Sequence, residues 1–323
     1  MNGVMVISLD YELFWGVRDK RTINSYFENL NGVDCAIDLM LNLFSKEEIE
    51  VTWAVVGMLF LDNIETLKES ISIVNPAYKD KNLSPFNYIQ TYSGRDEKFH
   101  FASGVIDKIN TTKGQYIGSH TFSHYYCKEE GANDRDFSND LKMAVKIAQR
   151  SGIVLKSLVF PRNQIDDSLL YLLKNNNIES YRGNQKGWMY KTSVSNESLI
   201  KRLIRLFDHY VNISGSNTFD LDFLSPNSVN NIPASSFFRP YSSIFPFLEW
   251  LKIRRIKRSM TFAAKNGRGY HLWWHPHNFG MNTKENMRNL REIVNHFLFL
   301  KQKYGMTSLS MESLSNKIKT SRK

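Results

Sequence analysis

Two histidines, His120 and His124, lie four residues apart in the stretch GQYIGSHTFSHYYCKE, residues 114–129. On a helix or in a tight turn, this spacing puts both imidazole rings on one side, where they can bind one divalent metal ion. A metalloprotease of the HExxH type needs a glutamate directly after its first histidine, and this chain has Thr121 there. The pair therefore indicates a metal site of a different kind.

A hydrolytic metal site needs a third protein ligand, usually a carboxylate, and open positions for water and substrate. The segment SLDYELFWG supplies Asp10 and Glu12 at the end of the first apolar run of the chain. Alternate residues of an extended segment point the same way, so both carboxylates can face one pocket. One can then bind the metal while the other acts as a general base. The alternative is a carboxylate that caps the turn after the strand.

The elements that must position these side chains alternate along the chain. Strands are predicted at 3–10, 50–57, 114–120, 156–161, 178–183, 269–275 and 306–311, and helices at 33–44, 138–152, 166–176 and 284–305. This alternation predicts an α/β fold with a mostly parallel sheet, but it does not separate a barrel from an open sheet. Four predicted strands end in Asp10, His120, Arg162 and His275. Because binding sites of such folds lie at the carboxyl ends of the strands, these residues should meet.

The order of these motifs resembles the polysaccharide deacetylase family, of the NodB-homology or carbohydrate esterase 4 type. The resemblance spans about residues 3–280, and SHTFSH matches the His-Ser/Thr-x-x-His metal motif of that family. It implies a distorted (β/α)7 barrel with long insertions. We expect a single catalytic domain over residues 1–323, insertions at about 63–113 and 184–265, and a flexible tail at about 315–323.

The resemblance also implies roles for individual residues. Glu12, His120 and His124 would bind one divalent metal; zinc suits this ligand set, and cobalt, nickel, iron and manganese are alternatives. Asp10 would be the general base. Tyr11 stands where the family usually has a second aspartate, so the roles of Asp10 and Glu12 can also be exchanged.

A second set of roles follows from the later motifs. Arg162 in FPRNQ would hold the catalytic aspartate, with Arg182 and Arg239 as rivals. His275 in HLWWHPHNFG would be the general acid, with His277 as the fallback. The remaining predicted substrate contacts are the backbone amide of Tyr125 for the oxyanion, and the rings of Trp15 and Trp188 for stacking on a sugar, with core packing as the alternative for the rings.

The implied activity is removal of an N-acetyl or N-formyl group from a sugar. The predicted substrate is a nucleotide- or polyprenyl-linked intermediate of bacterial surface-polysaccharide biosynthesis. Two alternatives remain: a metal-independent cyclic-amide hydrolase of the same fold, and an inactive glycan-binding member. The second is motivated by the departures at Tyr11 and in FPRNQ.

Charge and composition bear on location and partners. The net charge of +10 attracts polyanions, but the chain has no recognisable nucleic-acid-binding motif. Residues 247–260 mix basic and apolar side chains, which indicates either a solvated helix face or a patch for peripheral contact with an anionic membrane. The absence of a long apolar run, of a secretory signal and of a cysteine framework predicts a cytoplasmic protein, or one held at the inner face of the membrane.

Overall fold

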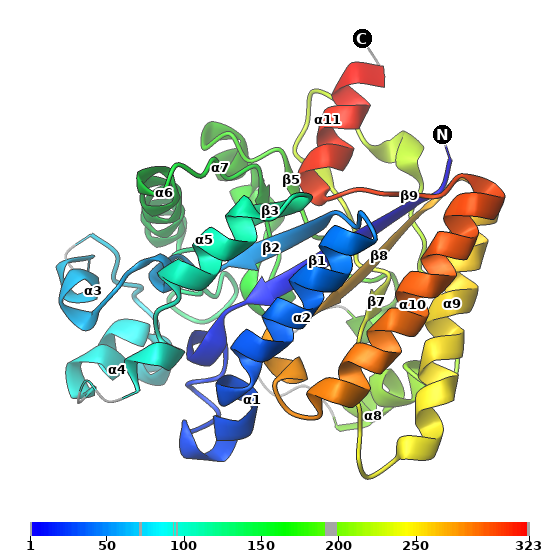
Figure 1. Ribbon diagram of the computed structural model, residues 1–323. Helices are drawn as coiled ribbons and strands as arrows, with labels where there is room; N and C mark the ends of the chain where they lie inside the picture. Colours follow the sequence, from blue (N-terminus) through cyan, green and yellow to red (C-terminus); the bar gives the residue numbers. More distant parts are fainter. Residues whose placement is uncertain (1, 71–72, 93, 95, 191–198, 322–323) are drawn as a thin grey trace.

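The fold is built around β1 (Val4–Tyr11), whose eight residues are all buried. The computed structural model describes residues 2–70, 73–92, 94, 96–190 and 199–321 (Figure 1). In it, β1 pairs in parallel with β2 (Val51–Val55) on one side and with β8 (Gly269–Trp274) on the other. A strand that is covered on both faces typically has a run of apolar residues, and β1 provides one from Val4 to Ile7.

The other strands extend this sheet on both sides. They are β3 (Gln115–Ser119), β4 (Ser157–Leu158), β5 (Ser180–Tyr181), β6 (Asn230–Asn231), β7 (Ser236–Phe237) and β9 (Thr307–Ser308). The order is β6-β5-β4-β3-β2-β1-β8-β7, with β9 beside β1, and every strand pairing is parallel.

One chain segment joins the two edges of the sheet. β6 and β7 are its ends, and between them the amide of Ala234 donates to the carbonyl of Gly183 at 2.9 Å, while the amide of Ser235 donates to the carbonyl of His271 at 2.8 Å. The sheet therefore curls into a distorted barrel, as predicted. With this segment counted once and β9 left aside, the described residues form seven strands of the barrel.

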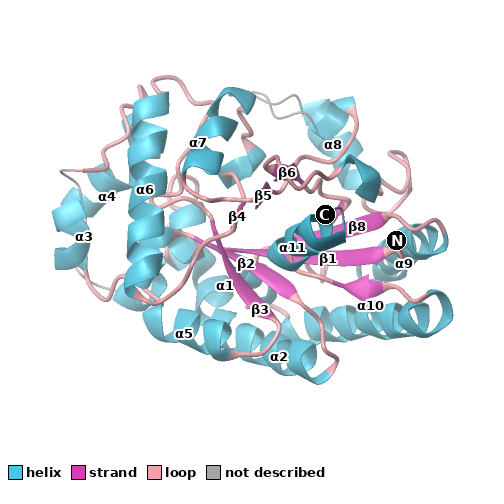
Figure 2. Ribbon diagram, turned by 90° about the horizontal axis from the view of Figure 1, so that it is seen from above, coloured by secondary structure: helices cyan, strands magenta, loops and turns pink. Residues whose placement is uncertain are grey.

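Helices cover the outside of the sheet (Figure 2). They are α1 (Phe27–Asn31), α2 (Val33–Lys46), α3 (Ile64–Ser70), α4 (Pro85–Thr91), α5 (Ser103–Thr111), α6 (Asp134–Arg150), α7 (Leu170–Asn175), α8 (Leu199–Asp208), α9 (Glu249–Lys265), α10 (Thr283–Tyr304) and α11 (Met311–Ser321). α10 shows why such segments are helical: Leu290, Ile293, Phe297 and Leu300 recur every three or four residues and are buried. Its C-cap is Gly305, which has a φ of 67°.

The predicted insertions need correction. Segment 184–265 contains β6, β7 and α9, and α9 buries Ile253, Ile256 and Met260 in the main core. Much of this segment is therefore scaffold, although residues 191–198 lie outside the described residues. In segment 63–113, α5 packs against β3 as a barrel helix does.

The predicted flexible tail is also wrong for residues 315–321. They belong to α11, which buries Leu314, Ser315 and Ile318. Residues 322–323 lie outside the described part of the chain. Among the described helices, none is both long enough and apolar enough to cross a bilayer.

Candidate active site

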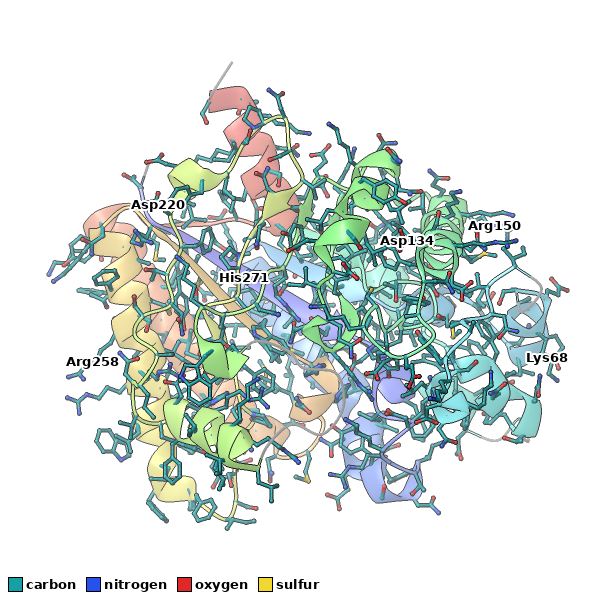
Figure 3. All side chains as sticks on the ribbon, turned by 180° about the vertical axis from the view of Figure 1, so that it is seen from behind. Lys68, Asp134, Arg150, Asp220, Arg258 and His271 are labelled. Atoms are coloured by element: carbon teal, nitrogen blue, oxygen red, sulfur yellow. The ribbon has the colours of Figure 1, made fainter. Side chains whose placement is uncertain are left out.

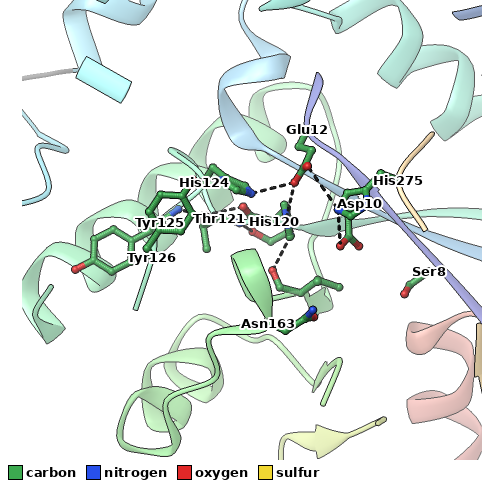
Figure 4. A network of polar contacts seen from close by, with 12 residues as sticks. Ser8, Asp10, Glu12, His120, Thr121, His124, Tyr125, Tyr126, Asn163 and His275 are labelled. Atoms are coloured by element: carbon green, nitrogen blue, oxygen red, sulfur yellow. Dashed lines mark hydrogen bonds and ion pairs between the residues drawn. The ribbon is translucent and has the colours of Figure 1, made fainter. Parts of the chain in front are cut away.

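Successive side chains of β1 point to opposite faces of the sheet, and its polar side chains point into the barrel. Met5, Ile7 and Leu9 belong to the core that packs under the surrounding helices, while Val4 and Val6 face the smaller core inside the barrel. Ser8 and Asp10 continue this inner row. Glu12 follows directly after the strand and is also buried, so β1 delivers two carboxylates to one place (Figure 4).

Glu12, His120 and His124 form a cluster of three possible metal ligands. The Nε2 atoms of His120 and His124 lie 3.2 Å and 3.0 Å from Oε2 of Glu12. One ligand atom from each of the three residues lies within 4.8 Å of the others. Two imidazoles and a carboxylate are a donor set that divalent transition metals prefer.

The second ring nitrogens show how these rings are oriented. Nδ1 of His120 lies 2.8 Å from the carbonyl oxygen of Val159, which can only accept, so Nδ1 carries the hydrogen. In the neutral ring, Nε2 then directs a lone pair toward Glu12. Nδ1 of His124 lies 3.1 Å from the Tyr126 hydroxyl, and burial lowers the pKa of His124 to about 4. A lone pair that faces a carboxylate is repulsive unless a cation lies between them, so the orientation of the His120 ring fits a bound metal.

The loop that carries both histidines has an unusual backbone. Thr121 and His124 have φ values of 61° and 56°, a left-handed conformation that is rare for residues other than glycine and most of all for β-branched ones. The Thr121 hydroxyl donates to the His120 carbonyl at 2.6 Å and accepts from the Tyr125 amide at 2.7 Å. A strained turn, rather than a helix, therefore brings the two histidines together, and such strain is typical of functional sites.

Asp140 on α6 holds this loop in place. The amides of Phe122 and Ser123 donate to its two carboxylate oxygens at 2.6 Å and 3.0 Å, and the Ser123 hydroxyl donates to it as well. Asp140 belongs to none of the motifs recognised in the sequence. The available signal was a carboxylate on the apolar face of a helix, beside Phe137, Leu141 and Ala144, all of which are buried.

We predict that Asp140→Ala destabilises the protein by about 1–3 kcal/mol for each buried N–H group that it leaves unsatisfied. Metal retention should weaken at the same time, because the loop between the two histidines loses its support. Urea unfolding and metal analysis would measure both effects. Asp134→Ala, at an exposed position of the same helix, is the matched control. Equal stability of the two variants would contradict this role for Asp140.

Asp10 is held by Arg182. The two guanidinium Nη atoms donate to the two carboxylate oxygens at 2.6 Å and 2.7 Å, and both side chains are buried. Burial alone would raise the pKa of Asp10, but Arg182, together with His120 and His275, holds it below its ordinary value. Asp10 is therefore ionised at neutral pH and able to accept a proton.

Further contacts fix Arg182 in turn. Its guanidinium donates to the Ser8 hydroxyl and to Oδ1 of Asn163, both at 3.0 Å, and lies 4.0 Å from the centre of the Trp273 ring. The Ser8 hydroxyl lies 2.8 Å from Nε2 of His271, whose Nδ1 contacts the Ile232 carbonyl at 3.0 Å.

Arg162 does not hold Asp10, which corrects the prediction from FPRNQ. It pairs with Asp19, and its guanidinium lies 4.2 Å from the centre of the Tyr126 ring. The reason is a tight turn after β4, in which Arg162 and Asn163 both have a φ of 53°. The turn directs Asn163 to Arg182 and directs Arg162 away. Arg182, the rival candidate, makes the contact with Asp10.

His275 follows β8 and faces both carboxylates. Its Nε2 lies 3.5 Å from Oε1 of Glu12 and 3.8 Å from Oδ2 of Asp10, and its side chain is 23% exposed. It is thus the site residue with access to both the carboxylates and solvent. The neighbouring His277 stacks on His275, with 5.1 Å between ring centroids, but is buried, and burial lowers its pKa to about 3.

Two predicted substrate contacts are wrong. The Tyr125 amide already donates to the Thr121 hydroxyl, so it is not open to an oxyanion. Trp15 is fully buried and its Nε1 donates to the His100 carbonyl at 2.8 Å, which is a packing role. Trp188, by contrast, is 61% exposed.

A cavity of about 830 Å³ adjoins the site through Asn163 and Trp273, both of which contact Arg182. The described residues that line it include one carboxylate, from Glu129, and five basic side chains, from Lys20, Arg162, Arg202, Arg205 and Arg239. Trp273 is one of the lining residues. The cavity suits an anionic ligand that also offers a flat or apolar surface.

Comparison with known proteins supports this fold. No protein-family model and no curated protein sequence matches the chain. A solved structure from Mycobacterium smegmatis, described as a polysaccharide deacetylase, superposes with a TM-score of 0.59 and 10% identity over 99% of this chain and 91% of that one. The PuuE allantoinase superposes with a TM-score of 0.52 and 9% identity over 97% and 89%. At such identities the likeness establishes the fold, which is the polysaccharide deacetylase type of distorted barrel.

Proposed function

We propose that this chain is a metal-dependent hydrolase that removes an N-acetyl or N-formyl group from a sugar and acts as one catalytic domain. The observation that carries the proposal is the position of His275, with Nε2 3.5 Å from Glu12 and 3.8 Å from Asp10. This position brings a proton donor, an ionised carboxylate and the three possible metal ligands into one site. Amide hydrolysis by this kind of chemistry needs these groups together.

The geometry favours Glu12 as the ligand and Asp10 as the base. Glu12 faces both histidines, whereas Asp10 has both oxygens engaged by Arg182. A divalent metal bound by Glu12, His120 and His124 would polarise the amide carbonyl and lower the pKa of water.

Asp10 and His275 would then each carry out one proton transfer. Asp10, kept ionised by Arg182, takes a proton from the attacking water. His275 gives a proton to the leaving amine nitrogen and regains it from solvent, because its ring is partly exposed. Ser8 and Asn163 keep Arg182, and through it Asp10, in one orientation.

The cavity beside the site supports a substrate whose sugar carries a phosphate or diphosphate. Arg162, Arg202 and Arg239 line it, and arginine pairs well with phosphate oxygens. A nucleotide sugar or a polyprenyl-linked sugar of surface-polysaccharide biosynthesis meets this requirement. The predicted cytoplasmic location, or a location at the inner face of the membrane, stays a prediction.

The test compares metal content and acetate release in wild type and in the His120→Ala/His124→Ala variant. We expect about one metal per wild-type chain, its loss in the folded variant, and acetate release from N-acetylated nucleotide sugars by wild type only. His296→Ala, on α10 away from the cluster, is the matched histidine control.

Two outcomes would count against the proposal. A wild type that stays metal-free after supplementation with zinc and cobalt would remove the metal site. Amide hydrolysis that persists in the presence of a metal chelator would favour the alternative, a metal-independent cyclic-amide hydrolase. The likeness to the fold of an allantoinase motivates this alternative.

A further inference from the structure

Helix α8 presents apolar side chains to solvent. Leu199, Ile200, Leu203 and Phe207 are all exposed, with Leu199 at 72%. These residues recur at the spacing of one helical face, so they form a stripe rather than isolated exceptions. Soluble proteins rarely expose such a stripe unless it meets another surface.

A second apolar segment lies at the same end of the molecule. Ile244, Phe245, Phe247 and Trp250 are exposed, with Ile244 at 76%. They precede or begin α9, and Figures 1 and 3 both place α8 beside that end of α9. An ion pair of 2.8 Å between Arg255 on α9 and Asp208 on α8 joins the two helices.

The exposed charge in these two segments is positive. The acidic residues of 199–215 and 242–262 are Asp208 and Glu249. Both are buried in ion pairs, the second with Lys252 at 2.7 Å. Lys252 and Arg255 therefore do not belong to the exposed basic patch predicted for 247–260. The exposed cations are Arg202, Arg254 and Arg258, and Figure 3 shows Arg258 on the outer side of α9.

A cavity of about 550 Å³ lies between α9 and α10 beside this apolar segment. Its lining includes Trp250, Arg254, Arg258 and Arg288, together with two carboxylates, from Glu249 and Glu292, that are paired with Lys252 and Lys257. The Arg254 guanidinium lies 5.6 Å from the centre of the Trp250 ring, an arrangement that suits an anionic head group whose ester or acyl part contacts the ring.

We propose that this docking face, made of the exposed apolar residues of α8 and of 244–250 together with Arg202, Arg254 and Arg258, binds the surface of an anionic lipid bilayer. The apolar side chains would enter the boundary between head groups and acyl chains, and the arginines would contact anionic head groups. Tryptophan at such a surface prefers this boundary. A second copy of the chain fits less well, because two such faces would bring arginine against arginine.

Docking would also set the orientation of the cavity that adjoins the site through Asn163 and Trp273. Leu199, Arg202 and Leu203 belong to the docking face and also line that cavity. The cavity would therefore open toward the head-group layer. If the proposed function holds, this favours a sugar held on a lipid diphosphate over a free nucleotide sugar.

The test is binding to vesicles of phosphatidylcholine with and without phosphatidylglycerol, measured by sedimentation without substrate. We expect wild type to bind the anionic vesicles, and Arg254→Glu/Arg258→Glu to bind them at least about 10-fold more weakly. Ile200→Glu/Phe207→Glu should lose binding too. Phe223→Ser is the matched control: Phe223 is 84% exposed, and its neighbour Asp220 lies at the end of the molecule opposite the docking face in Figure 3.

A second measurement uses tryptophan fluorescence. Brominated lipid should quench the tryptophan fluorescence of wild type more than that of Trp250→Phe.

Three results would overturn the proposal: no binding to anionic vesicles at low salt, equal binding by the variants, or a wild-type dimer that dissociates in Ile200→Glu/Phe207→Glu. Because vesicle binding needs no turnover, its failure is separate from failure of the proposed activity. An Ile200→Glu/Phe207→Glu variant that releases acetate normally from a water-soluble substrate, yet does not bind vesicles, would support docking as a distinct property.

Discussion

The Asp10→Asn variant should hydrolyse N-acetylated sugars about 10²–10⁴-fold more slowly than wild type and still retain its metal. An amide cannot take a proton from water at neutral pH, whereas its oxygen can still accept from Arg182 and keep the side chain in place. Acetate release and metal analysis on the same preparation would measure both properties. Asp19→Asn, which alters the carboxylate that pairs with Arg162, is the matched control.

The same experiment tests the assignment of the two carboxylates. If Asp10→Asn lost the metal while Glu12→Gln kept it, the two roles would be exchanged. If Asp10→Asn were as active as wild type, Asp10 would have no role as a base. Circular dichroism should show that each variant is folded before its rate is interpreted.

Arg182→Met should reduce the free energy of unfolding by about 3–5 kcal/mol. Methionine fills much of the same space, but it leaves the buried Asp10 carboxylate without the cation that binds both of its oxygens. Urea unfolding would measure the loss. Lys79→Met is the control, because Lys79 and Glu130 form an exposed ion pair and should contribute at most about 1 kcal/mol.

The effect of Arg182→Met should depend on pH. In wild type the pKa of Asp10 is below its unfolded value of about 3.9, so the pair contributes stability above that pH and loses it as the pH falls through the folded pKa. In the variant, burial is no longer offset by Arg182, and the pKa of Asp10 should rise above the unfolded value. The variant should then gain stability as the pH falls from about 7 toward 4, and the gap to wild type should narrow. A gap that does not change with pH would contradict the ionised pair.

The sequence predicted the inner parts of this structure better than its periphery. β1, β2, β3 and β8 are buried runs, and the polar residues that end or follow β1, β3 and β8 meet as expected. β6 and β7 were missed because their residues, Asn-Asn and Ser-Phe, do not form an apolar run. α11 was missed because its last buried residue, Ile318, lies between Lys317 and Lys319 in a segment rich in serine and lysine.

Within the site, contacts that depend on turns could not be predicted. Arg162 and Arg182 both follow strands that are neighbours in the sheet, and the left-handed turn at Arg162 and Asn163 decides which one reaches Asp10. The Tyr125 amide was unavailable for a similar reason, since the left-handed Thr121 places its own hydroxyl against it. The support by Asp140 depends on how α6 packs, which local sequence does not reveal.

The pairing of β1 has a consequence for how the chain folds during synthesis. β1 emerges from the ribosome well before β8, and one of its edges pairs with β8, where Val4 lies opposite Gly269. At a synthesis rate of about 5–20 residues per second, this edge stays unpaired for on the order of tens of seconds. An apolar strand with an open edge readily joins other chains. The nascent chain should therefore depend on chaperones, and Asp10 and Glu12 meet His275 only after β8 has been made.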